Sequence, residues 1–394
     1  MNRKRKSAKA QKNFFVANAA LFLGGLVTFG AEYCVQPIIP VFTKTFGLEP
    51  ATASLAVSFG TAGMACSMIL IALFAKILPR KIIMTIALVA ASLLAILISV
   101  SENFGLILAL RFVQGILLAG FPAMAVAYIN EEFDSKIIGA VTGIYIAGTS
   151  VGGLVGRILL SFLTDVLNWR IALGILGAIY FLMGVAFLFT LPKPQHRVEK
   201  IFDGTRLGDF AKLFRNANLM SLYVVAAAVM GVFVCTYNFI SYVLLAPPHN
   251  LSQTQIGLIY FLFLFGTASS TMMGRLADKF GNGKILLASI VFMFAGVGLT
   301  CSNLLAIKLS GVGLVTYGFF GAHSSAASWV GKLDDSDKAR LSAGYMFVYY
   351  VGASVIGSAG GKFLTAFDWS GVALFMTTIL LIALSMCLRL LRRA

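Results

Sequence analysis

The chain has 394 residues, of which 59% are hydrophobic and only 12% are charged. Because soluble domains carry roughly 25% charged residues, this composition excludes a soluble protein and indicates a polytopic membrane protein. The net charge is +16, from 31 Lys and Arg against 15 Asp and Glu. This excess does not indicate nucleic-acid binding, because the cations follow the membrane topology described below. They also suit contact with anionic lipid headgroups.

The cysteines stand apart from one another in apolar runs, and none forms a C-x-x-C pair. We therefore expect no metal site, no disulfide framework and no bound cofactor. The five cysteines are Cys34, Cys66, Cys235, Cys301 and Cys387.

A helix that crosses a bilayer takes about 20 apolar residues. We expect an all-α membrane protein, and the boundary between its ninth and tenth spans depends on Ser302 and Asn303 alone. The sequence predicts twelve transmembrane helices, at residues 14–40, 51–75, 82–100, 104–129, 138–164, 171–191, 218–245, 255–274, 285–302, 304–330, 341–366 and 370–388.

The predicted spans fall into two sets of six. In the linker between the sets, Leu207 to Phe214 have the apolar spacing of a short amphipathic, interfacial helix. The predicted divisions are a basic tail (1–13), a first six-helix bundle (14–191), the linker (192–217), a second six-helix bundle (218–388) and a second basic tail (389–394).

Most Lys and Arg residues lie in the two tails, in the linker and in the loops after the other even-numbered spans. By the positive-inside rule, both termini are then cytoplasmic. The apolar run after the first tail is too long for a signal peptide, so we expect no cleaved leader. The expected location is a bacterial inner (plasma) membrane, which the chain crosses many times.

The two halves resemble each other at an offset of about 200 residues. Residues 148–157 (GTSVGGLVGR) align with residues 352–361 (GASVIGSAGG), and a run of acids precedes each stretch, at 131–134 and at 334–337. An offset of an even number of spans predicts parallel repeats about an axis normal to the membrane. Alternating-access carriers have this arrangement.

Gly148, Gly152 and Gly156 recur at four-residue spacing and therefore line one face of a helix. Such a face lets a second helix approach backbone to backbone, as in membrane proteins. Arg157 then places a permanent charge at membrane depth, where it must face a partner or a water-filled cavity. We interpret the three glycines as a gating element beside a transport pathway.

Residues 274–284 (GRLADKFGNGK) resemble the G-x-L-A-D-[RK]-x-G signature of the major facilitator superfamily, in the loop after the eighth span. The resemblance implies that Gly274, Asp278 and Gly281 act in gating, with the acid capping a neighbouring helix. Residues 72–81 (ALFAKILPRK) stand where a first copy belongs, with Lys76 in place of the acid. We expect that lysine either to pair with one of Asp334, Asp335 and Asp337 or to lie in a solvated turn.

Three further stretches carry the resemblance. Residues 111–115 (RFVQG) are similar to the R-x-x-Q-G element of the superfamily, and residues 37–40 (PIIP) to the P-x-x-P of its proton-coupled drug exporters. Residues 148–157 resemble the antiporter signature of the fifth span, with Gly153 in place of its proline and Arg157 in place of its last glycine. Over nearly its whole length the chain resembles the YnfM-like branch of efflux permeases. The resemblance is carried by residues 148–157 with Asp165 and 168–170 (NWR), by residues 33–37 (YCVQP) and by residues 322–329 (AHSSAASW). It implies two six-helix bundles around a central cavity and drug:proton antiport.

Glu32 is the only carboxylate well inside a predicted span, and Arg111 and Arg157 lie at a similar depth. Burial disfavours the charged carboxyl and a nearby arginine favours it, so opening and closing of the bundles would change its proton affinity. We predict that Glu32 is the proton-coupling acid and that Arg111 modulates it. The alternative is that Glu32 is a fixed structural partner of a buried arginine.

Two arginines against one carboxylate leave the outer part of the cavity positive. A second hypothesis is therefore an anionic substrate held by Arg157; the alternative is a packing charge satisfied by carbonyls or lipid phosphate. His323, in the inner half of the tenth span, is predicted to relay protons on the cytoplasmic side. Its alternative is a packing histidine near Ser324 and Ser325.

Aromatic and amide side chains gather in the seventh and eleventh spans. They offer apolar area with a few hydrogen bonds, which suits drug-sized molecules, although lipid-facing aromatics are common too. The predicted substrate-binding residues are Glu32, Gln36, Arg111, Gln114, Arg157, Tyr237, Asn238, Tyr242, Tyr345 and Tyr349.

The sequence has no H-E-x-x-H, G-x-S-x-G or phosphate-binding loop, so neither an enzyme nor an ATP-driven pump is indicated. We predict a monomeric secondary active transporter that exports small amphiphilic molecules or drugs by alternating access, driven by a proton gradient. Its partners would be the small-molecule substrate, protons and membrane lipids. The alternative is a facilitator, symporter or antiporter for small organic anions or sugars.

Overall fold

A computed structural model of the whole chain describes residues 2–74, 79–134, 137–194, 213–333 and 338–392. Within helices, the side chains of residues 2–13, 69, 72–74, 338 and 339 are not described. All regular elements in these ranges are helical, and ten stretches are long and apolar enough to cross a membrane. The prediction of an all-α membrane protein is confirmed.

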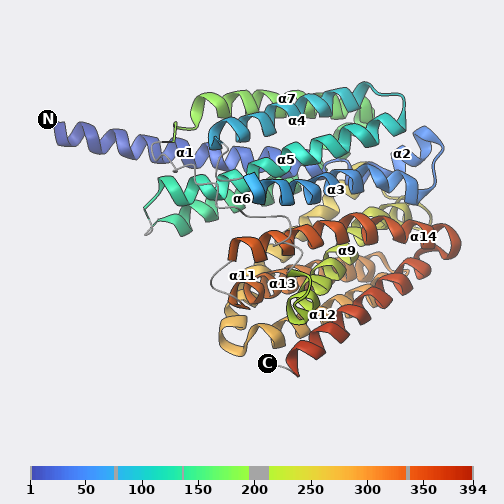
Figure 1. Cartoon of the computed structure of the whole chain (residues 1–394). Helices are drawn as coiled ribbons and strands as arrows, with labels where there is room; N and C mark the ends of the chain where they lie inside the picture. The colour runs from blue at the N-terminus through green and yellow to red at the C-terminus, as the bar shows by residue number, and fades with distance from the viewer. Residues whose placement is uncertain (1, 75–78, 135–136, 195–212, 334–337, 393–394) are drawn as a thin grey trace.

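The helices of the first half pack into one bundle, the upper one in Figure 1. Within it, α1 packs on α6, α3 packs on α5, and α4 lies between α5 and α7. In chain order the elements are α1 (Asn2–Tyr33), η1 (Gln36–Ile38), α2 (Ile39–Phe46), α3 (Pro50–Phe74), α4 (Arg80–Val100), α5 (Phe104–Glu132), α6 (Ile138–Val166) and α7 (Trp169–Thr190).

The second half forms the lower bundle of Figure 1, in which α9 packs on α14 and α12 packs on α13. Nearly every side chain of α9 from residue 225 to residue 241 is buried. The elements are α9 (Ala217–Leu245), α10 (Gln253–Leu258), η2 (Ile259–Leu262), α11 (Phe263–Phe280), α12 (Asn282–Thr300), α13 (Leu305–Leu333) and α14 (Lys338–Leu391).

The helices follow the order of the predicted spans, with α14 serving as two arms. Phe367 and Asp368 have non-helical dihedral angles inside α14, and the chain reverses there. α12 ends at Thr300 and α13 begins at Leu305, so the boundary predicted at Ser302 and Asn303 is correct.

The first tail is helical from Asn2 onward, in continuity with α1. The motif at 274–284 was expected in a loop, and this is wrong. The motif runs through the end of α11 and the start of α12, because Gly281, with a φ of +89°, makes the turn alone. Residues 207–212 of the predicted interfacial helix lie outside the described residues.

The predicted repeat is visible in how the glycine-bearing helices pack. A Cβ atom at Gly152 of α6 would lie 2.1 Å from the carbonyl oxygen of Leu26 in α1. In the second bundle, a Cβ atom at Gly352 of α14 would lie 2.2 Å from the carbonyl oxygen of Ala227 in α9. The aligned stretches thus make the same kind of backbone contact, each inside its own bundle.

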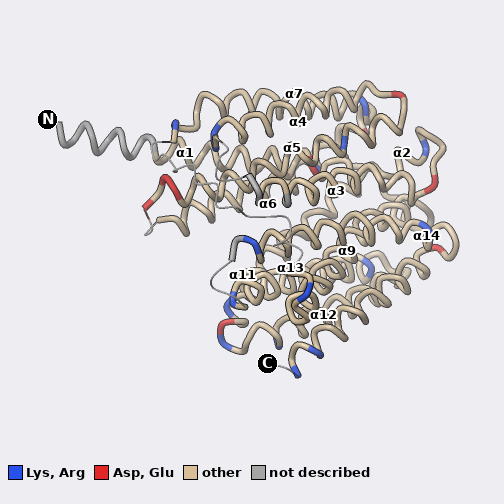
Figure 2. Tube along the Cα trace, viewed as in Figure 1, with Lys and Arg blue, Asp and Glu red and all other residues tan. Residues whose placement is uncertain are grey.

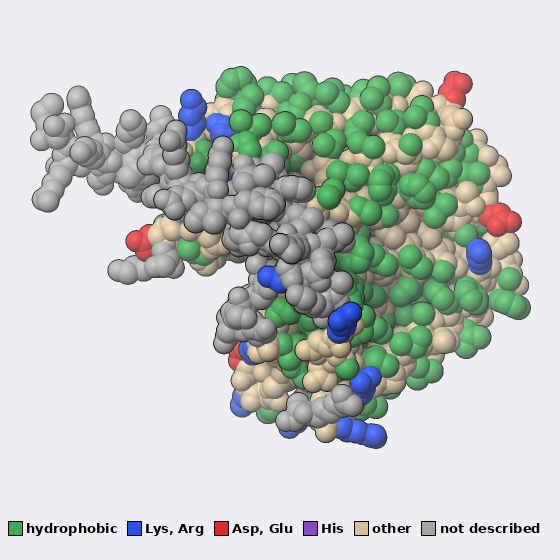
Figure 3. All heavy atoms as spheres, in the orientation of Figure 1, with side chains coloured by type: hydrophobic (Ala, Val, Ile, Leu, Met, Phe, Trp, Pro, Cys, Tyr) green, Lys and Arg blue, Asp and Glu red, His purple; other side chains and the backbone are tan. Residues whose placement is uncertain are grey.

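Both chain termini lie at one end of the molecule, which we call the terminal side; the opposite end, with α2 and the turn of α14, is the distal side (Figure 1). Figure 2 shows most charged residues at these two ends. The flank of the molecule in Figure 3 is dominated by hydrophobic side chains between the ends. This distribution is that of a protein whose flanks face lipid.

The two bundles meet along a distal seam, in which α3 packs on α14 and α6 packs on α10. Among the described residues, seven hydrogen-bonded pairs that involve polar side chains join the bundles, and only the pair with Asp165 includes a formal charge. The pairs are Gln36 with Asn238 (2.9 Å), Thr43 with Tyr242 (2.6 Å), Ser58 with Ser358, Thr61 with Ser354 (2.7 Å), Gln253 with the Pro37 carbonyl (2.9 Å) and with Ser161 (3.5 Å), and Asp165 with Thr254 (2.5 Å).

Candidate functional site

The centre of the site is the end of α1. That helix stops at Tyr33, four residues before Pro37, and a proline has no N–H to bond the Tyr33 carbonyl. The last carbonyls of a helix lack intrahelical partners and carry negative partial charge. The P-x-x-P stretch therefore leaves a group of acceptors in the interior of the first bundle, directly beside Glu32.

Arg111 of α5 occupies these acceptors. Its Nη1 donates to the Ala31 carbonyl (3.1 Å), and its Nη2 donates to the backbone carbonyl of Glu32. Its Nε donates to the Ala56 carbonyl in α3 (2.8 Å), and Nη1 also donates to Gln114 Oε1 (2.5 Å). The guanidinium thus joins α1, α3 and α5, and it is 1% exposed.

The carboxylate of Glu32 is held much less firmly. Its Oε1 lies 3.6 Å from Arg111 Nη2, and the side chain is fully buried. Neither carboxylate oxygen has a hydrogen-bond partner among the described residues. An ionised carboxylate in such a place is stabilised by one ion pair and by no hydrogen bond, which is a costly arrangement.

Gly60 of α3 provides the space for this pair. A Cβ atom there would lie 2.5 Å from Glu32 Oε1 and 2.6 Å from Arg111 Nη2. Gly115 of α5 is in close backbone contact with Gly60, because a Cβ atom at Gly115 would lie 1.9 Å from the Gly60 carbonyl oxygen. The two glycines bring α3 and α5 close enough for Arg111 to reach α1.

Arg157 of α6 lies at the junction of the two bundles. Its guanidinium carbon is 4.7 Å from the ring centroid of Tyr33 in the first bundle. It is 5.0 Å from that of Tyr260 and 4.9 Å from that of Phe263, both in the second bundle. Rings at these distances attract a cation through their π faces. Tyr260 lies in η2, the 3-10 segment that interrupts the eighth predicted span, which the sequence did not predict.

A hydrogen-bond chain runs from Arg157 across the seam. Its Nε donates to Gln36 Oε1 (2.9 Å), and Gln36 Nε2 donates to Asn238 Oδ1 (2.9 Å). Asn238 Nδ2 then donates to the Gly357 carbonyl in α14 (2.9 Å). The predicted residues Arg157, Gln36 and Asn238 are therefore brought together, and all three are buried.

The remaining predicted tyrosines lie in different parts of the molecule. Tyr242 pairs with Thr43 in the distal seam, and Tyr237 is fully buried with its hydroxyl 2.8 Å from Thr316 Oγ1. Tyr345 and Tyr349 lie in the first arm of α14, near its start at Lys338, with their ring centroids 6.2 Å apart. The predicted substrate-binding residues thus do not form one continuous surface in this state.

His323 of α13 lies beside Tyr345 and Tyr349. Its Nδ1 is 3.0 Å from the Tyr345 hydroxyl, and its ring centroid is 4.8 Å from that of Tyr349. The ring of Phe319 is nearly parallel to it, with the centroids 6.0 Å apart and an interplanar angle of 15°, and lies 6.4 Å from the ring of Tyr349. We call His323, Phe319, Tyr345 and Tyr349 the aromatic shelf.

The predicted gating residues lie away from the contact between the bundles. The glycines Gly148, Gly152 and Gly156 face α1 of their own bundle. A Cβ atom at Gly274 would make only an ordinary contact with Ser324. Asp278 is exposed and has no hydrogen bond or ion pair with the described residues, so it does not cap α12 in this state.

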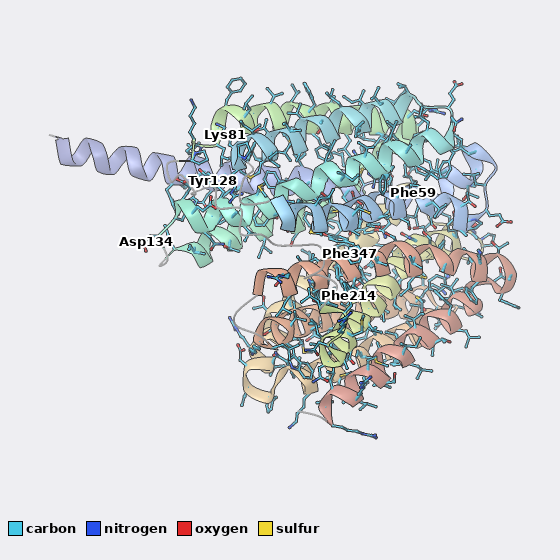
Figure 4. All side chains as sticks on the ribbon, viewed as in Figure 1. Phe59, Lys81, Tyr128, Asp134, Phe214 and Phe347 are labelled. Atoms are coloured by element: carbon cyan, nitrogen blue, oxygen red, sulfur yellow. The ribbon has the colours of Figure 1, made fainter. Side chains whose placement is uncertain are left out.

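The terminal end of the first bundle has polar contacts that the sequence did not predict. Arg80 pairs with Glu131 (2.8 Å), and Lys81 Nζ donates to the Leu191 carbonyl (2.5 Å). The Tyr128 hydroxyl donates to the Pro192 carbonyl (3.2 Å). Figure 4 shows Lys81 and Tyr128 at this end. The proposed partners of Lys76, like Lys76 itself, lie outside the described residues.

Comparison with models of known protein families shows to which family the chain belongs. The family model described as Major Facilitator Superfamily matches residues 21–246 and, in a second copy, residues 233–394. The chain belongs to the major facilitator superfamily. The resemblance noted in the sequence is therefore confirmed at the level of the family, and with it the transport class and the multi-pass membrane location.

Two relatives extend over nearly the whole chain. The uncharacterized MFS-type transporter YybF of Bacillus subtilis (strain 168) is 39% identical over 93% of this chain and 91% of its own. The inner membrane transport protein YnfM of Escherichia coli (strain K12) is 35% identical over 96% of this chain and 91% of its own. These identities confirm the similarity to the YnfM-like branch of the superfamily.

A solved structure shares the fold. A bacterial homolog of the human lysosomal transporter Spinster, in an inward-facing and unoccupied conformation, superposes with a TM-score of 0.78 at 17% identity. The superposition covers 97% of both chains. The chain thus shares the fold of that structure, which agrees with the predicted arrangement of membrane helices in two bundles.

Sequence reasoning missed Gly60 and the hydroxyl pairs of the distal seam. Their signals were present but unspecific, because small residues are common in membrane helices.

Proposed function

We propose that this protein is a proton-coupled secondary active transporter in which Glu32 carries the proton and Arg111 sets its electrostatic environment. The observation that supports this most is the unequal hydrogen bonding of Arg111 and Glu32. Arg111 donates its hydrogen bonds to carbonyls and to Gln114, while the Glu32 carboxylate has, among the described residues, the ion pair and no hydrogen bond. The arginine is held in place whether or not Glu32 is charged.

A proton on Glu32 removes the cost of a buried charge, and opening of the distal seam restores water to it. The acid lies one residue from Tyr33 and four from Gln36, both of which contact Arg157 at the seam. Separation of the bundles there would therefore change the surroundings of Glu32. This gives the proton a physical link to the conformational change that alternating access requires.

We further propose that the terminal side is cytoplasmic and that the membrane is the bacterial inner membrane, as the distribution of Lys and Arg indicates. The closed distal seam then corresponds to a state that is shut toward the outside. An exporter in this state receives its substrate from the cytoplasm, and the antiporter-like stretches favour export of amphiphilic molecules. The proposed functional unit is a monomer without a cofactor.

Transport in proteoliposomes tests the proposal. A pH gradient is imposed, and accumulation of uncharged, cationic and anionic aromatic compounds is compared for the wild type, Glu32→Gln and Glu102→Gln. Glu102 is an exposed acid at the distal side and serves as the matched control. Gradient-driven accumulation should be lost in Glu32→Gln only. Full accumulation by Glu32→Gln would reject the proposed role of this acid.

A further inference from the structure

We infer that an anionic phospholipid, from the leaflet at the terminal side, binds along the outer face of α11. Its phosphate contacts Arg275 and Lys279, and one acyl chain lies in a groove beside Met272, Ala268 and Phe265. The site is separate from the buried acid and arginines of the candidate functional site, so the inference does not depend on the proposed proton coupling.

The first support is an exposed stripe along η2 and α11. Its six residues recur at alternate spacings of four and three, so they share one face, and all six are exposed. The four nearer the distal side are apolar, and the two nearer the terminal side are cations. In chain order they are Phe261, Phe265, Ala268, Met272, Arg275 and Lys279. A stripe that changes from apolar to cationic along its length complements the tail and the phosphate of an anionic lipid.

The second support is the shape of the surface along this stripe. Two hollows, with volumes of about 700 and 540 Å³, adjoin at Ala268. The larger hollow lies between η2 and the start of α13, where Leu262 and Leu309 border it, and the smaller one continues along α11 to Arg275. We call the two together the α11 groove. At membrane depth such an apolar groove is filled by hydrocarbon, because no water is available there.

The third support is the length of the groove. Phe265 and Arg275 are ten residues apart in α11, which corresponds to about 15 Å at a rise of about 1.5 Å per residue. A hydrocarbon core is about 30 Å thick, so this distance is the depth of one leaflet. A phosphate held at Arg275 therefore brings its acyl chain past Ala268 and as far as Phe265.

The fourth support is the chemistry of the terminal part of the groove. The hydroxyls of Thr267 and Thr271, which line it, donate to the carbonyls of Phe263 and Thr267 in their own helix, both at 3.3 Å. Arg275 has no hydrogen bond or ion pair with the described residues. Two cations against one acid, Asp278, leave the end of α11 positive. A free guanidinium suits a phosphate, whereas a polar substrate in the groove would lose its hydrogen bonds to water.

The α11 groove is continuous with the contact between the bundles. Leu262 borders the groove, and the next residue, Phe263, contacts the Arg157 guanidinium at 4.9 Å. An acyl chain that reaches Phe265 ends where η2 joins α11. It therefore supports the segment that places two of the three rings beside Arg157. We expect the bound lipid to stabilise this part of the distal seam.

Fluorescence quenching in vesicles tests the inference on the full-length protein. The exposed Cys66 and Cys301 are replaced by Ser, and Ala268→Cys is labelled with bimane. The vesicles are phosphatidylcholine, in which a fraction is replaced by phosphatidylglycerol or by phosphatidylcholine that carries bromine at mid-chain. We expect brominated phosphatidylglycerol to occupy the site at least about fivefold better than brominated phosphatidylcholine, the worth of one cation near a lipid surface.

Matched variants assign this preference to the two cations of α11. Arg275→Gln/Lys279→Gln should remove it, and Arg275→Lys, which keeps the charge, should retain most of it. Arg389→Gln removes an exposed cation from the terminal end of α14 and should leave the preference unchanged. A second reporter at Leu381, 52% exposed and eight residues before Arg389, measures the general attraction of this side for anionic lipid. Its preference should be smaller than that at Ala268.

Equal quenching by the two brominated lipids at Ala268 would overturn the inference. So would a wild-type preference in Arg275→Gln/Lys279→Gln with an unchanged melting temperature. A preference at Ala268 no larger than that at Leu381 would show only general surface attraction, and would also reject the site. Quenching at Leu381 with none at Ala268 would mean that a second copy of the chain covers the groove in place of lipid.

Discussion

Glu32 Oε1 lies 3.6 Å from Arg111 Nη2, yet the hydrogen bonds of that guanidinium go to backbone carbonyls and to Gln114. The ion pair is therefore the weaker of two attachments of the arginine. In a fixed structural pair, the carboxylate would be expected to take the fork of the guanidinium directly, in bidentate geometry. Here the carboxylate is free to change its charge without releasing the arginine.

Gly60→Ala should impair proton coupling more than it impairs folding. The added methyl group would meet both Glu32 Oε1 and Arg111 Nη2 at about 2.5 Å, and these long side chains can move away from it. The pair would then separate, and the pH dependence of transport should shift. Gly143→Ala, on an open face of α6, is the matched control and should behave as the wild type. An unchanged pH profile in Gly60→Ala would show that the separation of the pair is irrelevant.

Arg111→Gln should destabilise the protein strongly. It removes the partners of three carbonyls and leaves Glu32 as an unpaired buried charge, a loss of about 3–5 kcal/mol for breaking a buried pair. Thermal unfolding in detergent measures this. The double variant Glu32→Gln/Arg111→Gln should be more stable than Arg111→Gln alone, because no charge is then left behind. Additive losses would mean that the two side chains do not interact.

Asn238→Leu should favour opening of the distal seam. The substitution cuts the hydrogen-bond chain from Arg157 through Gln36 to the second bundle. Double electron–electron resonance measures the opening. The spin labels are placed at Glu49 and Asp368, which are exposed at the distal ends of the two bundles. The exposed Cys66 and Cys301 are first replaced by Ser. The distance distribution should gain a longer component in Asn238→Leu.

Asn130→Leu is the control for this measurement, because Asn130 is exposed at the terminal end of α5 and its side chain donates to the Val126 carbonyl of the same helix. Its distance distribution should match that of the wild type. If Asn238→Leu also matched the wild type, the chain from Arg157 would not hold the seam closed.

Gly152→Val should lower stability, because its side chain would run into the backbone of Leu26 at about 2 Å, and backbone cannot move aside. The expected loss is about 1–3 kcal/mol. The same substitution at Gly143 should cost little, since no atom lies within 4 Å of a Cβ atom there. Equal melting temperatures for the two variants would contradict the close contact of α1 and α6.

The sequence predicted the helices and the repeat because both depend on periodic, local features. The apolar runs set the spans, and the aligned glycines at 148 and 352 predicted two equivalent helix contacts. It also placed Glu32, Arg111 and Arg157 at one depth from helix geometry alone, and the structure shows Glu32 beside Arg111.

The partners of these residues could not be predicted, because they depend on how the helices cross. Nothing in the sequence indicates that Arg111 bonds the end of α1, or that Gly60 faces the pair. Gln36 and Asn238 are 202 positions apart, and only the contact between bundles brings them together. Of the three rings beside Arg157, that of Tyr260 lies in η2, and no residue pattern in the sequence predicts this 3-10 segment.

Proton movement driven by a substrate gradient tests the central claim most directly. Proteoliposomes that hold a pH-sensitive dye receive a pulse of a transported compound on one side, with no pH gradient at the start. The wild type and Glu102→Gln should show a proton flux opposite to the substrate flux, and Glu32→Gln should move substrate with no change in the pH of the lumen. A proton flux of wild-type size in Glu32→Gln would contradict the assignment of Glu32 as the group that carries the proton.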